Sequence, residues 1–142
     1  PSQGFNECYD TANAVAFAQG LDYLVALLPA TDATNGLVSP QVLTALQRGA
    51  VFINAGRANC VVTADLEAAL TGGILRAVVL DVLPCEPLPD DDPLWNLDNF
   101  YITSHTAAPT LADSVVALFA GNYRRFVAGQ PLLHAIDFDR GY

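Results

Sequence analysis

Arg57, Glu86 and His105 are the residues of this 142-residue chain whose types and spacing could do chemistry, because each stands shortly after an apolar run. A planar guanidinium suits the two oxygens of a carboxylate, and an imidazole can give and take a proton. A carboxylate beside that imidazole would favour the protonated ring and hold its orientation. If the apolar runs are parallel strands, these side chains converge where ligands bind in open α/β sheets. The spacing therefore predicts an anion clamp, a proton donor and the donor's partner in one cleft.

The apolar runs alternate with helix-like stretches, which is typical of βαβ units around a parallel sheet. We expect strands at residues 21–28, 50–54, 76–82 and 99–103. We expect helices at residues 40–46, 64–70 and 111–127, the first two capped by Ser39 and Thr63. The start of the chain, residues 1–17, fits a strand end and a short helix, and residues 84–93 fit a proline-rich loop.

The composition excludes several functional classes. Hydrophobic residues make up 52% of the chain and charged residues 15%, and the net charge is −9, which indicates an acidic globular domain. That charge disfavours nucleic acid, which needs a basic protein face. No apolar run approaches the roughly 18 residues that span a bilayer, so no membrane partner is expected. Lysine is absent, which excludes Schiff-base chemistry and a P-loop.

No metal is expected from the cysteines or the acidic residues. Cys8, Cys60 and Cys85 show no metal-like spacing, and we expect them to be free thiols in a reducing cytoplasm. The run Asp90–Asp92 invites a metal hypothesis, but consecutive carboxylates in a proline-rich loop are usually solvated. The sequence thus predicts a cytoplasmic protein without bound metal.

Five short motifs follow one another along the chain. They are Leu28-Pro29-Ala-Thr31 with Thr34, Asn54-Ala-Gly-Arg57 with Val61-Val62, Leu80-Asp-Val82 with Cys85-Glu-Pro87, Pro93-Leu-Trp95, and Ser104-His-Thr-Ala-Ala108. In this order and spacing they resemble the C-terminal half of the D-2-hydroxyacid dehydrogenases, from about Leu21 onward. The closing residues 139–142 are most similar to the glyoxylate/hydroxypyruvate reductase A branch of that family.

The resemblance implies NAD(P)H-dependent reduction of a small 2-keto acid, of the glyoxylate or hydroxypyruvate type, with NAD or NADP as cofactor. Arg57 would bind the carboxylate and carbonyl oxygen of the keto acid, His105 would protonate that carbonyl oxygen, and Glu86 would hold the histidine. Asp81 would bind the nicotinamide carboxamide. The residues that match cofactor-lining positions are Leu28, Pro29, Thr34, Ala55, Gly56, Arg57, Asp81, His105, Ala107 and Ala108.

The resemblance further implies an α/β fold with a Rossmann-like parallel sheet and flanking helices, as an incomplete NAD-binding domain. The turn Gly-x-Gly-x-x-Gly, which binds the pyrophosphate, does not occur in the chain. We expect a partial dinucleotide-binding domain with the catalytic residues over residues 1–106. A long helix and tail over residues 107–142 would return toward a substrate domain. The chain would then be a C-terminal portion of a homodimeric reductase and inactive alone.

Two alternatives stay open at this point. The chain could belong to another branch, such as the phosphoglycerate or formate dehydrogenases, although residues 139–142 argue against both. It could also be a non-catalytic binding or oligomerisation module that keeps the fold, which the missing glycine turn favours. The presence of Arg57, Glu86 and His105 argues against that second alternative.

Overall fold

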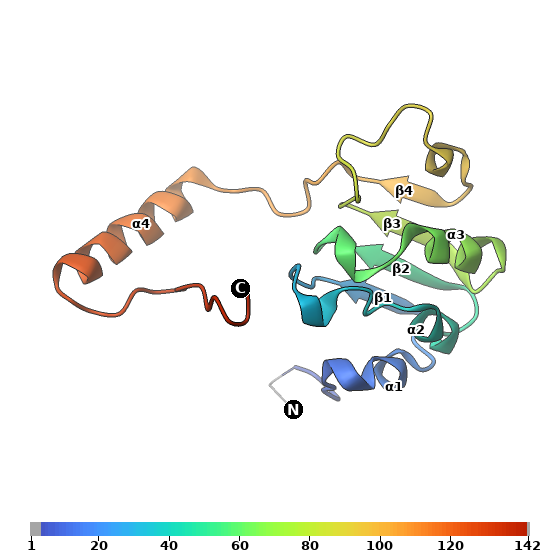
Figure 1. Ribbon diagram of the computed structural model, residues 1–142, viewed down its shortest axis with the longest axis horizontal. Helices are drawn as coiled ribbons and strands as arrows, with labels where there is room; N and C mark the ends of the chain where they lie inside the picture. Colours follow the sequence, from blue (N-terminus) through green and yellow to red (C-terminus); the bar gives the residue numbers. More distant parts are fainter. Residues whose placement is uncertain (1–3, 142) are drawn as a thin grey trace. The chain divides into compact units, whose positions relative to one another are not determined.

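The computed structural model describes residues 4–141 and divides into two compact units between His105 and Thr106. The first unit holds a four-stranded parallel sheet whose strands lie side by side in chain order (Figure 1). The strands are β1 (Tyr23–Ala26), β2 (Ala50–Asn54), β3 (Leu75–Leu80) and β4 (Phe100–Ile102). The helices of this unit are α1 (Ala14–Ala18), α2 (Pro40–Ala45) and α3 (Thr63–Thr71). The predicted α/β class, with a parallel sheet and flanking helices, is confirmed.

The core lies on one face of this sheet. Leu24, Phe52 and Val78 occupy matching positions on β1, β2 and β3, and all are buried. Removing this apolar surface from water is the main stabilising contribution to the fold. The helical residues that pack into the same core are Ala18, Val42, Leu43, Leu66 and Ala69.

The opposite face of the sheet is largely open within the first unit. Tyr23, Val25 and Tyr101 project from this face, and each is more than half exposed. Arg76 crosses part of it, where the guanidinium donates to the Tyr23 hydroxyl at 2.8 Å and lies 5.5 Å from the ring centroid. β1 is also an edge strand, so its outer backbone groups are not paired within the sheet.

β1 is shorter than the strand predicted at residues 21–28. The carbonyl of Leu21 accepts the N–H of Gln47, in the connection after α2, and so lies outside the strand ladder. At the other end, the chain leaves the ladder after Ala26, where Gly56 packs directly against the following backbone. Apolar side chains therefore continue past the point at which strand pairing stops.

Two further predictions differ from the structure: the N-cap of α3, and a strand end before α1. Thr63 is not the N-cap of α3, because the carbonyl of Val62 already accepts the N–H groups of Asp65 and Leu66. Val62 is the N-cap, and Thr63 is the first helical residue. Near the start of the chain, residues 4–10 form no strand and only the predicted helix appears, as α1; residues 1–3 lie outside the described part.

The second unit consists of α4 (Ala112–Val127) and a tail that returns along it. The side-chain amide of Asn122 accepts the N–H of Leu133 at 2.8 Å and donates to the carbonyl of Leu133 at 3.0 Å. Arg125 also donates to the carbonyl of Pro131. Within residues 4–141, no helix combines the length and the apolar character needed to cross a bilayer.

The turn after β2 packs so closely on the turn after β1 that only glycine fits at position 56. A Cβ atom there would lie 2.6 Å from the backbone nitrogen and 2.7 Å from the carbonyl oxygen of Leu28. Both are main-chain atoms, so relief requires the two strand ends to move apart. We expect Gly56→Ala to lower the free energy of unfolding by about 1–3 kcal/mol in urea denaturation, the usual cost of overpacking.

Gly121→Ala is the matched control for this substitution. A Cβ at Gly121, inside α4, would meet nothing within 4 Å beyond its own helix backbone. Alanine should therefore leave stability unchanged or raise it by up to ~1 kcal/mol through helix propensity. A Gly56→Ala protein as stable as the wild type would mean that the two turns do not pack as described.

Candidate active site

Arg57 stands on the turn that follows β2 at the carboxyl edge of the sheet. Its side chain is exposed, and Nη1 donates to the carbonyl of Gly56 at 2.8 Å. Asn54, the last residue of β2, is 1% exposed and hydrogen-bonds to the same turn. Its Oδ1 accepts the N–H of Gly56 at 3.0 Å, and its Nδ2 donates to the carbonyl of Arg57 at 3.1 Å. The backbone that carries Arg57 is thus tied to a buried side chain.

Asp81, directly after β3, anchors the backbone of His105. Asp81 is 6% exposed, its Oδ1 accepts the hydroxyl of Thr103 at 2.6 Å, and its carbonyl accepts the N–H of His105 at 2.8 Å. Ser104 and His105 have φ angles of 36° and 55°, a region that non-glycine residues seldom occupy. Such strain persists only where the surrounding structure holds it, and it gathers at functional sites.

Glu86 and His105 form a hydrogen-bonded pair. Nδ1 of His105 lies 2.8 Å from Oε2 of Glu86, and the two side chains are 50% and 38% exposed. The other carboxylate oxygen, Oε1, accepts the N–H of Leu83 at 2.8 Å. The hydrogen bond with His105, followed by that from Leu83, lowers the pKa of Glu86 below its usual range. An ionised carboxylate therefore holds one ring nitrogen, and Nε2 is the position through which His105 can exchange a proton with a ligand.

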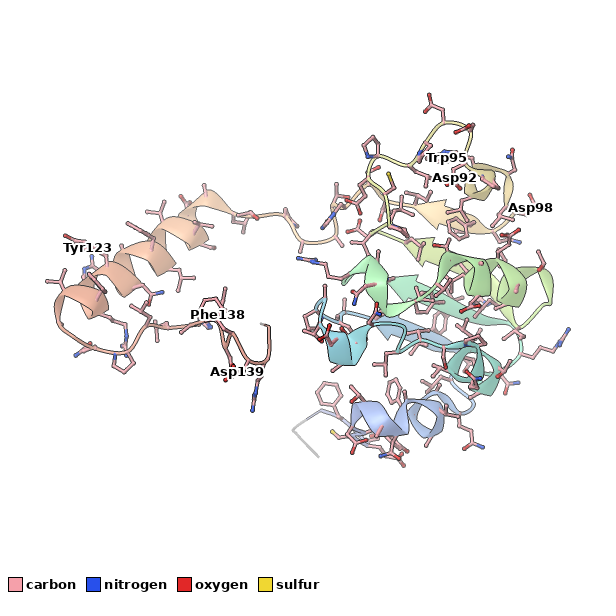
Figure 2. All side chains as sticks on the ribbon, in the orientation of Figure 1. Asp92, Trp95, Asp98, Tyr123, Phe138 and Asp139 are labelled. Atoms are coloured by element: carbon pink, nitrogen blue, oxygen red, sulfur yellow. The ribbon has the colours of Figure 1, made fainter. Side chains whose placement is uncertain are left out.

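Trp95 braces the loop that carries Glu86. Its indole Nε1 donates to the carbonyl of Pro89 at 2.8 Å, and the N–H of Asp92 reaches the same carbonyl at 3.1 Å. Asp92 is in turn the N-cap of the short 3₁₀ helix Pro93–Asn96. Figure 2 shows Trp95 and Asp92 together on this loop, beside β4. Trp95 thus supports the loop by a hydrogen bond, whereas the sequence indicated no specific contact for it.

Arg57, Glu86 and His105 line one cavity of about 370 Å³. The structure therefore brings together the three residues that the sequence singled out for chemistry. Asn59 lines the same cavity but was missed, because its place depends on the short 3₁₀ helix Ala58–Cys60 that follows Arg57. The remaining lining residues are Ala30, Ala58, Val82, Leu83 and Pro84.

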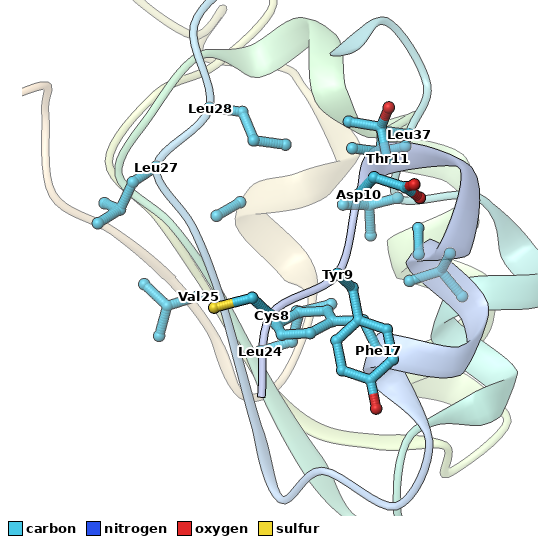
Figure 3. Close-up of a pocket in the computed structure, with 14 residues that line it drawn as sticks. Cys8, Tyr9, Asp10, Thr11, Phe17, Leu24, Val25, Leu27, Leu28 and Leu37 are labelled. Carbon is cyan, nitrogen blue, oxygen red and sulfur yellow. The ribbon is translucent and has the colours of Figure 1, made fainter. Parts of the chain in front are cut away.

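A second pocket, of about 450 Å³ and mostly apolar, lies between β1 and the segment that precedes α1. Figure 3 shows Leu27 and Leu28, from the turn after β1, lining one side of it. Tyr9 and Phe17 line another part, and their rings pack edge to face with centroids 5.8 Å apart. Apolar walls of this kind suit a planar aromatic ring such as that of a nucleotide base.

The other residues predicted to line a cofactor lie in different surroundings. Thr34 is buried within its own turn, where its hydroxyl donates to the carbonyl of Pro29 at 2.6 Å. Ala55 donates its N–H to the carbonyl of Ala26 and so extends the pairing of β1 with β2. Ala107 and Ala108 belong to the second unit. Within residues 4–141, no three His, Cys, Asp or Glu residues are grouped so as to hold a metal ion.

Comparison with known proteins gives consistent matches. A model of the D-isomer specific 2-hydroxyacid dehydrogenase NAD-binding domain matches residues 5–107. Glyoxylate/hydroxypyruvate reductase A of Klebsiella pneumoniae is 36% identical over 126 residues, which are 89% of this chain and 40% of the relative.

Two solved structures show the same fold. The D-isomer specific 2-hydroxyacid dehydrogenase of Xanthobacter autotrophicus, crystallised with NADPH and MES, gives a TM-score of 0.87 at 39% identity. The match covers 92% of this chain and 54% of that one. The NADPH-dependent glyoxylate/hydroxypyruvate reductase of Sinorhizobium meliloti, crystallised with NADP and sulfate, gives 0.87 at 37% identity, over 94% of this chain and 44% of that one.

The chain therefore spans about half the length of these relatives, or less. The Rossmann-like fold that the sequence predicted is confirmed, and the family domain that the chain matches is an NAD-binding domain, as the resemblance implied. The chain belongs to the D-isomer specific 2-hydroxyacid dehydrogenase family, with residues 5–107 matching its NAD-binding domain.

Proposed function

We propose that this chain is the C-terminal portion of an NAD(P)H-dependent reductase that converts a small 2-keto acid into the 2-hydroxy acid. Glyoxylate and hydroxypyruvate are the proposed substrates, since relatives named for them are 36% and 37% identical to the chain. The observation that carries the proposal is the cavity that Arg57 shares with the hydrogen-bonded Glu86–His105 pair. Arg57 can bind an anion and His105 can donate a proton, and both side chains line this cavity.

His105 is the proposed proton donor. Because Glu86 holds Nδ1, Nε2 is the nitrogen that gives its proton to the carbonyl oxygen as negative charge develops there. The Glu86 carboxylate, bound to Nδ1, holds the ring in one orientation. In the oxidation direction, the same nitrogen takes the proton back from the hydroxyl group.

Arg57 is the proposed substrate-binding residue. Its guanidinium presents donors in a planar fork that matches a carboxylate and the neighbouring carbonyl oxygen. The bond from Nη1 to the carbonyl of Gly56 restrains one end of that fork. A 2-keto acid held in this way places its carbonyl oxygen in the cavity that His105 also lines.

The cofactor is proposed to lie along the carboxyl edge of the sheet, where dinucleotides cross such folds. The bound nicotinamide ring would supply the hydride for the reduction. Leu28, on the apolar pocket, suits the adenosine end, and Asp81, after β3, suits the carboxamide end. The further residues that belong to this proposal are Pro29, Thr34, Ala55, Gly56, Ala107 and Ala108.

A longer polypeptide is part of this proposal. The matched relatives are about twice as long as the chain, and the edge strand β1 and the open sheet face leave room for a further strand and layer. Residues 107–142 would return toward a substrate domain, and the whole enzyme would be a homodimer. A cytoplasmic location accords with the free thiols of Cys8, Cys60 and Cys85.

The direct test is an assay of the product of the complete reading frame. We expect oxidation of NADPH or NADH, followed by absorbance, when glyoxylate or hydroxypyruvate is added. The 142-residue chain alone should show no turnover and nearly no heat on calorimetric titration with either dinucleotide. Absence of turnover with both keto acids would refute the proposed reaction, and tight dinucleotide binding by the chain alone would refute the need for a longer polypeptide.

His105→Asn and Arg57→Lys should impair that enzyme in different ways. Loss of the general acid should lower kcat by roughly 10²–10⁴-fold and weaken cofactor binding far less. A lysine keeps the charge but cannot form a bidentate fork, so Arg57→Lys should raise the KM for the keto acid. The matched controls are His134→Asn and Arg48→Lys, which lie outside the cavity. Equal effects of the site and control variants would rule out both roles.

The pKa of Glu86 provides a test on the chain itself. Because the hydrogen bond with His105 is the first cause of its lowered pKa, His105→Ala should raise the pKa of Glu86 toward its usual range. The carboxyl ¹³C signals can be followed with pH, since the chain has only three glutamates. Glu7 and Glu67 report changes elsewhere, and His134→Ala is the control. A Glu86 pKa that His105→Ala leaves in place would show that the two side chains do not interact in solution.

The same shift defines a pH window for stability. A carboxylate whose folded pKa is lowered adds stability above its unfolded pKa, and this contribution disappears as the pH falls through the lowered folded pKa. The Glu86–His105 contact should therefore stabilise the domain at neutral pH and cease to do so under acid conditions. Both side chains are partly exposed, so solvent screens the contribution.

A further inference from the structure

Asn54 is the buried polar side chain nearest in sequence to Arg57, and its hydrogen bonds reach across the whole turn between them. Its Oδ1 accepts the N–H of Gly56 at 3.0 Å, and its Nδ2 donates to the carbonyl of Arg57 at 3.1 Å. Nδ2 also lies 3.5 Å from Sγ of Cys60, in the 3₁₀ helix that follows. Asn54, which is 1% exposed, thus contacts Gly56 before Arg57, Arg57 itself and Cys60 after it.

The partners determine the orientation of this amide. A backbone N–H can only donate, so the atom that faces Gly56 must be the oxygen. A carbonyl can only accept, so the atom that faces Arg57 must be the nitrogen. An asparagine side chain supplies one acceptor and one donor at this spacing, and an aspartate that has lost its proton supplies no donor.

The backbone of Asn54 connects this amide to the rigid part of the sheet. Its carbonyl accepts the N–H of Asp81 at 2.8 Å, and its Cα pairs with that of Leu80 in the parallel ladder of β2 and β3. The amide therefore ties the position of two central strands to a turn whose other restraints are the bond from Ala55 to Ala26 and the packing of Gly56 on Leu28. This restraint extends to the side chain of Arg57, because its guanidinium donates to the carbonyl of Gly56 within the same turn.

We infer that Asn54 is a positioning residue for substrate binding. It holds the backbone of the Arg57 turn where the guanidinium can reach the carboxylate of the keto acid. The inference rests on the proposed function for the identity of the ligand, but not for the contact itself. Asn54 does not line the cavity of Arg57 and His105. Its effect on catalysis therefore passes through Arg57.

Kinetics of the complete enzyme separate positioning from a merely structural role. Asn54→Ala removes both hydrogen bonds, and we expect the KM for the keto acid to rise roughly 10- to 100-fold and the KM for the dinucleotide, which Ala55 and Gly56 of the same turn are proposed to line, to rise less. A variant that simply folds less well would lose kcat per mole of protein with both KM values unchanged, and this result would overturn the inference. Asn96→Ala, at an exposed asparagine, is the matched control and should match the wild type.

Asn54→Asp keeps the test decisive if Asn54→Ala does not fold. The carboxylate still accepts the N–H of Gly56 but cannot donate to the carbonyl of Arg57 once it is ionised. At the alkaline end of the activity range, we expect a raised keto-acid KM for this variant, smaller than that of Asn54→Ala. A keto-acid KM equal to that of the wild type under these conditions would overturn the inference.

A measurement on the chain alone distinguishes failure of this inference from failure of the proposed function. In ¹⁵N relaxation experiments, the backbone amides of Gly56 and Arg57 should become more mobile in whichever Asn54 variant folds, at alkaline pH for Asn54→Asp. Unchanged order parameters at both residues would overturn the positioning role, whatever the enzyme turns over. Increased mobility with no reductase activity in the wild type would uphold the contact and refute only the proposed reaction.

Discussion

The site depends on the parallel ladder of the sheet continuing past the ends of its strands. The N–H of Ala55 pairs with the carbonyl of Ala26, and the N–H of Asp81 pairs with the carbonyl of Asn54. The N–H of His105 then pairs with the carbonyl of Asp81. The first two bonds join the end of one strand to the chain after its neighbour, and the third joins the segments that follow β3 and β4, so the three turns are held at one common edge. Parallel strands bring their carboxyl ends to the same side, which is why such edges form binding sites.

Polar burial in the described part of the chain is concentrated at this edge. The buried polar or charged residues there are Thr34, Asn54 and Asp81. Thr34 and Asn54 donate to carbonyls of their own turns, and Asp81 accepts the hydroxyl of Thr103, just after the neighbouring strand. Burying such groups is costly unless they are paired. Their pairing restrains the turns that carry Arg57 and His105, although both of these side chains are exposed.

His105 illustrates how the backbone and the side chain are held by different partners. Its main chain adopts a positive φ that a histidine seldom occupies, and the bond to the carbonyl of Asp81 helps to retain it. Its ring is held by Glu86 from a separate loop, which Trp95 supports in turn. Two independent restraints thus determine where Nε2 points, as a proton donor requires.

The sequence predicted those parts of the fold that apolar periodicity controls. β2 was predicted with the bounds that it has, because Gly49 and Asn54 bracket a run that is buried almost throughout. β1 was predicted too long, since Leu27 and Leu28 remain apolar after the chain has left the ladder beside Gly56. No periodicity marks that departure, because it depends on a close approach between residues distant in the sequence.

The candidate site was predictable in its ionisable residues and not in their supports. Arg57, Glu86 and His105 have side chains that suggest chemistry in any context, and each follows a strand. The amide of Asn54 and the hydroxyl of Thr103 suggest nothing specific by type. Their importance lies in hydrogen bonds that become visible only when the partners are placed in space. A polar residue that ends an otherwise buried strand is a sequence signal that could have identified Asn54, whereas Thr103 follows a strand that is not buried.

The central claim is that Arg57 and the Glu86–His105 pair act on one bound 2-keto acid. A crystal structure of the complete enzyme with its dinucleotide and oxamate, a keto-acid analogue that resists reduction, tests this claim most directly. The account predicts that Arg57 binds the oxamate carboxylate and that Nε2 of His105 lies within hydrogen-bond reach, about 2.6–3.2 Å, of the carbonyl oxygen. Oxamate bound with His105 directed away from that oxygen, or on residues other than Arg57, would contradict it.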